Sequence, residues 1–151
     1  MPTYKHILVA VDLSDDTQLI LDRAKDEAQR HRAQLSLITV IKPFVMNYGT
    51  GYMMDYSGQL IEMEAELARN SHTQLAKLGT SLDVPTTRQH LELGSPAGEI
   101  RAAAEKNHAD LIVMGSHGRH GLGLLLGSTA TSVLHGCNVD VLVVRIPSSD
   151  K

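Results

Sequence analysis

The chain has 151 residues, of which 42% are hydrophobic and 21% are charged, and its formal net charge is −3. These values predict one soluble globular domain over residues 1–151 and exclude a disordered chain. The slightly acidic balance disfavours a nucleic-acid binder, which usually carries a basic surface.

Cys137 is the only cysteine, so an internal disulfide is excluded and no Cys/His zinc cluster is present. The first residues show no signal-peptide pattern, and the apolar runs are too short to span a bilayer. We therefore expect a cytoplasmic protein that neither crosses nor binds a membrane.

The first part of the chain predicts two strands around one helix. Residues 7–11 are a continuous apolar run, as in a strand buried on both faces, and residues 35–41 are a second. Between them Ser14 is predicted to cap an amphipathic helix. Asp12 either binds ribose hydroxyls or a divalent ion, or caps the turn together with Ser14.

The middle of the chain predicts an aromatic loop, a long helix and a third strand. The loop Phe44–Tyr56 holds four of the five aromatic residues. It is a lid over a site, a surface for a protein partner, or packing for the helix that follows. That helix runs through residues 60–78 and ends near Gly79, and residues 86–93 predict a strand.

The last part of the chain predicts two helices and two strands. Ser95 and Pro96 begin one helix, and residues 109–114 form a strand. A second helix covers residues 128–136, and a last strand follows at Val139–Ile146. Alternating strands and helices predict an α/β fold, a three-layer doubly wound parallel sheet with helices on both faces.

Ligands of such sheets bind at the carboxyl ends of the strands, where strand order reverses. Asp12 and Gly115 both follow strands, and they line one crevice if these strands are neighbours. Beyond Gly115 the chain is rich in glycine up to the helix at Ser128. A strand, a glycine-rich turn and a helix N-terminus together favour an anion. Residues 111–139 hold no Asp or Glu, which suits a phosphate.

The glycine-rich stretch matches neither a Walker A motif nor a dinucleotide fingerprint. His117 and His120 lack further ligands nearby, so no metal site is predicted, and phosphate contact or solvation explains them better. Cys137 is predicted to be a small buried hydrophobic residue. No nucleophile elbow or other catalytic set is present, so we predict no catalytic residues and no enzyme beyond a weak ATPase or autophosphorylating activity.

Three segments together resemble the universal stress protein A family. They are residues 5–14, residues 109–118, and Gly127-Ser128 with residues 139–145. The resemblance spans nearly the whole chain. It implies a five-stranded parallel sheet of order 3-2-1-4-5 and a homodimer formed through the last strand, Val139–Ile146.

Members of this family either bind ATP or bind no nucleotide. The binding members carry the loop Gly-x2-Gly-x9-Gly-Ser/Thr, and here Gly115-x2-Gly118 matches but Gly127 comes one residue early. This shorter spacing resembles the branch without nucleotide, whereas the retained glycines resemble the binding branch. Both alternatives, ATP or AMP binding and a nucleotide-free site, stay open.

If nucleotide binds, the resemblance assigns roles by position. Asp12 contacts ribose or, with ATP, a magnesium ion, and Arg119 adds charge to the phosphates. Adenine packs on Val40 and Met114. The phosphates and ribose are held by five residues, which are Gly115, Gly118, Gly127, Ser128 and Thr129.

The function expected is a cytoplasmic stress-response protein, a dimeric binding or signalling module regulated by ATP or AMP. One alternative is a slow ATPase or autophosphorylating enzyme. The other is a nucleotide-free dimerisation adaptor with an unknown protein partner.

Overall fold

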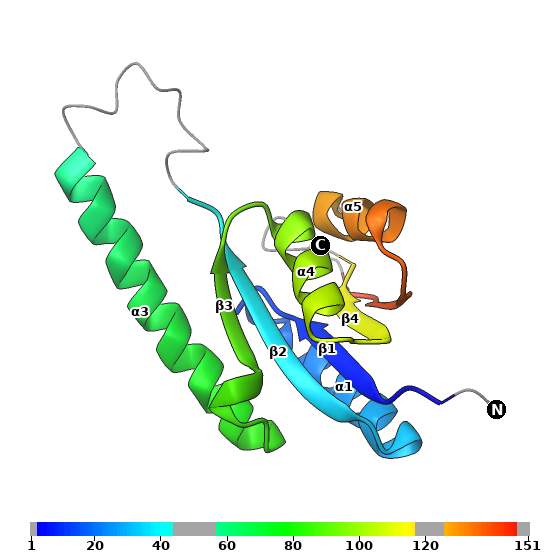
Figure 1. Cartoon of the computed structure of the whole chain (residues 1–151). Helices are drawn as coiled ribbons and strands as arrows, with labels where there is room; N and C mark the ends of the chain where they lie inside the picture. Colours follow the sequence, from blue (N-terminus) through cyan, green and yellow to red (C-terminus); the bar gives the residue numbers. More distant parts are fainter. Residues whose placement is uncertain (1–2, 44–56, 117–125, 148–151) are drawn as a thin grey trace.

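The computed structural model describes residues 3–43, 57–116 and 126–147, and its centre is a parallel sheet (Figure 1). The strands are β1 His6–Ala10, β2 Gln34–Ile41, β3 Gln89–Leu93, β4 Leu111–Gly115 and β5 Asp140–Val144. Neighbouring strands all pair in parallel, in the order β3-β2-β1-β4-β5. The predicted fold class and strand order are therefore confirmed.

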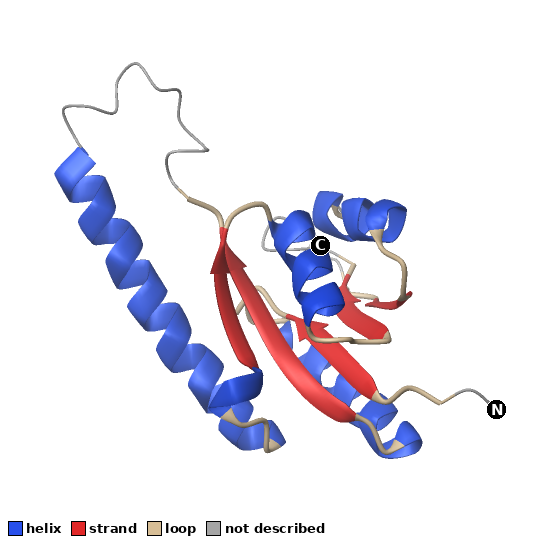
Figure 2. Ribbon diagram, in the orientation of Figure 1, coloured by secondary structure: helices blue, strands red, loops and turns tan. Residues whose placement is uncertain are grey.

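In the described ranges, two helices pack on each face of the sheet (Figure 2). The helices are α1 Thr17–His31, α3 Ser57–Leu82, α4 Pro96–Lys106 and α5 Ser128–Gly136. Side chains of a strand alternate between faces, so Ile7 and Val9 join a core with α1 and α3. Leu8 and Ile112 join a second core with α4 and α5. Both faces of the central strands are buried, which explains their continuous apolar runs.

Two local predictions are wrong. Residues Thr86–Arg88 form a short 3-10 helix, η2, because the Pro85 carbonyl accepts a hydrogen bond from the Arg88 amide at 2.9 Å. Ser14 does not cap α1, which begins at Thr17 after Asp16. The Ser14 carbonyl instead accepts a hydrogen bond from the Thr17 amide at 3.1 Å, so a separate turn precedes the helix.

Two smaller expectations, about helix ends, are met. Ser95 and Pro96 begin α4 as predicted, and α3 ends soon after Gly79. Cys137, which was predicted to be buried, is only half-buried against the α4 and α5 core, and its thiol donates to the Val139 carbonyl at 3.1 Å. None of the helices in the described ranges is long and apolar enough to cross a lipid bilayer.

Candidate site at the carboxyl ends of β1 and β4

Strand order reverses between β1, the central strand, and its neighbour β4. From β1 the chain crosses through α1 to β2 on one side, and β4 lies on the other side (Figure 1). Ile7 pairs with Leu111 and Val9 with Val113, so the two strands end at the same edge. This register brings the backbone after Ala10 close to the backbone after Gly115. Asp12 and Gly115 can therefore line one crevice, as the sequence predicts for neighbouring strands.

The Asp12 carboxylate is only half satisfied. Its Oδ1 atom accepts a hydrogen bond from the Ser14 amide at 3.1 Å. Its Oδ2 atom is buried and has no hydrogen-bond partner. A buried carboxylate oxygen without a partner is unfavourable, which makes it a receptor for a hydroxyl donor or a cation.

The turn that carries Asp12 has an unusual backbone. Leu13 has a φ of 61°, in the left-handed region that leucine rarely adopts. Its side chain packs against the core under α1, and this contact holds the strained backbone in place.

The N-terminus of α5 is joined directly to the end of β4. The Gly127 amide donates to the Ser116 carbonyl at 2.7 Å, and the Gly127 carbonyl accepts from the Thr131 amide at 3.0 Å. No side chain in the described part of the chain caps the helix. The amides of residues 128–130 have no acceptor within the helix, so the positive end of the helix dipole is available to an anion.

Ser116 is a tether that the sequence did not reveal. Its amide donates to the Val144 carbonyl at 2.8 Å, and its buried hydroxyl accepts from the Ile146 amide at 2.9 Å. Together with the bond from Gly127, these contacts fix the start of α5 against β4 and the end of β5. The only sequence signal was a serine directly after the strand.

The remaining predicted site residues differ in exposure, and some lie outside the described residues. Val40 is half-buried on β2, whereas Met114 on β4 is only 4% exposed, so Val40 offers more apolar surface to a ligand. Gly115 ends β4 opposite Val144, and Thr129 is half-buried while Ser128 is exposed. The structure thus gathers Asp12, Gly115, Gly127, Ser128 and Thr129 at one edge of the sheet. Gly118, Arg119, His117 and His120 lie outside the described residues, as does the loop Phe44–Tyr56.

The described residues include no group of three or more His, Cys, Asp or Glu side chains that could hold a metal. The orphaned oxygen of Asp12 nevertheless fits magnesium bound together with a nucleotide. Mg²⁺ retains several waters and often takes one carboxylate plus substrate phosphates.

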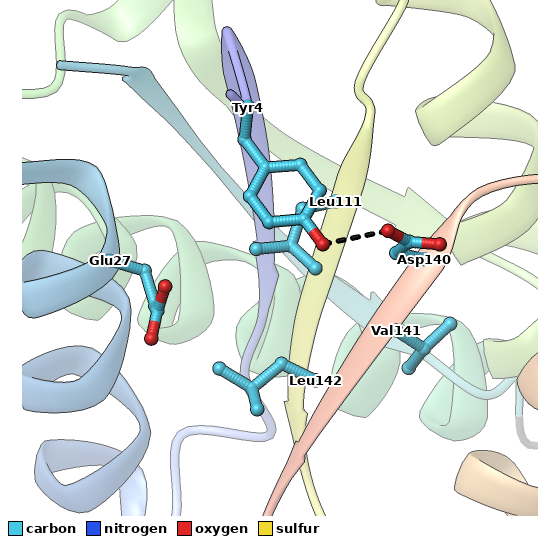
Figure 3. Close-up of a pocket in the computed structure, with 6 residues that line it drawn as sticks. All are labelled: Tyr4, Glu27, Leu111, Asp140, Val141 and Leu142. Atoms are coloured by element: carbon cyan, nitrogen blue, oxygen red, sulfur yellow. Dashed lines mark hydrogen bonds between the residues drawn. The ribbon is translucent and has the colours of Figure 1, made fainter. Parts of the chain in front are cut away.

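Away from this site, a pocket of about 320 Å³ lies at the amino ends of β4 and β5 (Figure 3). It is lined by Tyr4, Glu27, Leu111, Asp140, Val141 and Leu142. The Tyr4 hydroxyl donates to Asp140 Oδ2 at 2.7 Å. This bond, together with burial and the negative charge of Asp140, raises the pKa of Tyr4 above 10.0.

Glu27 is the buried carboxylate of this pocket, and the basic side chains beside it come from its own helix. Arg23 lies 3.2 Å from Oε1, Arg30 lies 3.8 Å from the same atom, and His31 lies 3.3 Å from Oε2. Sequence reasoning missed this cluster. The available signal was the position of Glu27 on the buried stripe of α1, between Ala24 and Ala28.

Comparison with known proteins shows which family this sequence matches. The model of the Universal stress protein family matches residues 3–145. Universal stress protein A homolog 1 of Coxiella burnetii is 38% identical over 93% of this chain and 96% of its own length. Universal stress protein A of Escherichia coli (strain K12) is 29% identical over 98% of this chain and 99% of its own length.

Solved structures agree with the sequence relatives. Universal stress protein UspA from Lactobacillus plantarum has a TM-score of 0.74 and 28% identity, covering 96% of this chain and 100% of that chain. A universal stress protein in complex with cAMP has a TM-score of 0.65 and 23% identity, covering 95% of this chain and 98% of that chain. The match over residues 3–145 places this chain in the universal stress protein family.

Proposed function

We propose that the chain is a cytoplasmic stress-response protein, a dimeric binding and signalling module regulated by an adenine nucleotide. The observation that supports this most is the buried, unpartnered Oδ2 of Asp12 at the switch point. Asp12 follows β1, and the neighbouring strand β4 leads to the uncapped α5. The Asp12 carboxylate accepts a hydroxyl or a cation, and the N-terminus of α5 accepts an anion. A nucleotide supplies a ribose hydroxyl, a bound magnesium ion and a phosphate.

Each group then has a role in binding. Asp12 accepts a ribose hydroxyl or binds the magnesium ion of ATP. The amides at Ser128 and Thr129 donate to phosphate, and Gly115 and Gly127 let the backbone approach closely. Val40 and Met114 pack on adenine. The roles of Gly118 and Arg119 rest on their sequence positions.

The proposed assembly is a homodimer through β5. This strand is one of the two edges of the sheet, and Val141–Val144 are all half-buried. Its outer backbone groups have no partner strand in the described chain. A second β5 would satisfy them and cover the valines.

Chemistry on the bound nucleotide is expected to be slow at most. Efficient phosphate transfer requires a group that activates the nucleophile, and Asp12 is the only acidic residue proposed at the site. The protein therefore acts by binding. A phosphate-release assay is the direct check, and rapid turnover would favour the alternative of an ATPase.

Calorimetry on nucleotide-stripped protein tests the proposal. ATP with magnesium, AMP and cAMP are titrated separately into the wild type. Saturable binding of at least one ligand is expected, and Asp12→Asn should weaken it about tenfold or more, because a charge-assisted contact is lost. The control is Asp22→Asn, which removes an exposed carboxylate on α1. Absence of heat at millimolar ligand would leave only the nucleotide-free adaptor.

A further inference from the structure

Four described residues other than glycine have a left-handed backbone, and one of them is out of place. Arg32, Asp83 and His108 follow α1, α3 and α4, with φ between 55° and 56°. A left-handed residue at a helix C-terminus is a common way to satisfy the last carbonyls. Leu13, with a φ of 61°, stands instead between β1 and α1, where it ends no helix.

Two contacts hold Leu13 in this conformation. Its side chain packs against the buried core under α1. On either side of it, the Ser14 amide donates to Asp12 Oδ1 at 3.1 Å, which closes a tight turn across Leu13. The core contact therefore fixes the turn, and the turn sets the orientation of the Asp12 carboxylate.

This orientation of the Asp12 carboxylate is energetically unfavourable in the protein without a ligand. Asp12 Oδ2 is buried without a partner, and the backbone of Leu13 is strained. Strain and unsatisfied polar groups persist where the surrounding structure enforces them, and they cluster at ligand sites.

We infer that Leu13 is a positioning residue of the nucleotide site. Its side chain anchors the left-handed turn, and the turn presents the free oxygen of Asp12 to the ligand before the ligand arrives. Leu13 itself does not touch the nucleotide. This inference rests on the nucleotide-binding function proposed above, and it adds the element that prepares the site for binding.

A double-mutant cycle on ligand affinity tests the inference. The dissociation constant of ATP with magnesium is measured by calorimetry for wild type, Asp12→Asn, Leu13→Gly and the double variant. Glycine adopts either sign of φ and has no side chain to anchor, so the turn is released. If Leu13 acts through Asp12, each single variant weakens binding about tenfold, and the double variant is no weaker than Asp12→Asn alone.

Two further variants separate positioning from a general loss of stability. His108→Gly makes the same change at an exposed left-handed residue behind α4, and its dissociation constant should equal that of the wild type. Leu13→Met keeps an apolar anchor and should bind within about twofold of the wild type. Should Leu13→Gly not fold, Leu13→Asn runs the same cycle, since asparagine tolerates the left-handed region but lacks the apolar anchor.

The outcomes are distinguishable. A wild type that binds no nucleotide overturns the proposed function, and this inference with it. A wild type that binds, combined with unchanged affinity in Leu13→Gly or with losses that multiply in the double variant, overturns the inference alone. Non-additive losses with an unaffected His108→Gly support it.

Discussion

His90, in the edge strand β3, combines two unfavourable features. Its Nε2 atom is buried without a hydrogen-bond partner. Burial also lowers the pKa of its imidazole below 6.5, with Lys106 and His6 acting in the same direction and the Glu92 carboxylate opposing them. The folded protein therefore favours the neutral form of this imidazole, and the buried nitrogen contributes little to stability.

The sign of the pH effect follows from linkage. Since the pKa of His90 is lower in the folded state, the unfolded chain binds a proton first as the pH falls below 6.5. Stability is lost in that window. The variant His90→Leu removes both the orphaned nitrogen and the proton, so we expect it to be more stable by about 1 kcal/mol at pH 7.5. The gain should be larger at pH 5.5.

Urea unfolding of both proteins at the two pH values measures this difference. The control His72→Gln alters an exposed histidine on α3, and its pH profile should follow that of the wild type. A variant His90→Leu with the wild-type pH profile, or one less stable than wild type at both values, would contradict the assignment.

The two glycines of helix α3 differ in how much space surrounds them. A Cβ on Gly58 would meet nothing within 4 Å. A Cβ on Gly79 would lie 2.6 Å from Gln89 Cδ and 3.0 Å from the Val84 carbonyl oxygen. Gln89 Nε2 donates to that carbonyl at 2.9 Å, so the side chain cannot withdraw without breaking the bond. Gly79 is thus required for the close approach of α3 to β3.

We expect the two alanine variants to shift stability in opposite directions. Gly58→Ala should stabilise the protein by about 0.5–1 kcal/mol, because alanine is the better helix former. Gly79→Ala gains the same propensity but overpacks the contact with Gln89, at a cost of about 1–3 kcal/mol. It should therefore be destabilising. Chemical denaturation of both variants checks the signs, and stabilisation by Gly79→Ala would show that Gln89 moves freely.

The elements were predictable because their signals are local. The buried run at residues 7–11 and the Ser95-Pro96 start of α4 needed no knowledge of the rest of the chain. The errors came from hydrogen bonds that the composition does not reveal. Pro85 closes η2 through its carbonyl, and Ser14 closes a turn ahead of α1.

The candidate site was predictable only in part, for a similar reason. Asp12 and Gly127 were identified from their places after a strand and before a helix. The left-handed backbone of Leu13 was not, since leucine disfavours it and a contact with the distant core enforces it. The tether through Ser116 joins β4, β5 and α5, so it exists only once the sheet is assembled.

On the scale of the whole molecule, the two edges of the sheet differ. Helix α3 runs along the β3 edge (Figure 1) and packs on β3 and β2. Among the described residues, no strand pairs with the outer side of β5. This strand carries a run of half-buried apolar residues without a proline or lysine to block pairing. Natural edge strands of this kind are usually protected by charge, by a bulge or by a partner strand.

A dimer through β5 makes a specific prediction for Val143. Among the apolar residues of this strand, Val141, Leu142 and Val144 pack against the two cores of their own chain, whereas Val143 is grouped with neither. Val143→Lys should therefore leave the monomer folded while placing two like charges at the symmetric interface, each stripped of water. Light scattering after gel filtration should show a dimeric wild type and a monomeric variant with unchanged circular dichroism. The control Leu134→Lys alters an apolar residue of α5 that is 44% exposed, and it should stay dimeric. A dimeric Val143→Lys would move the interface away from β5, because a lysine on each of two paired edges is a strong obstacle to their association.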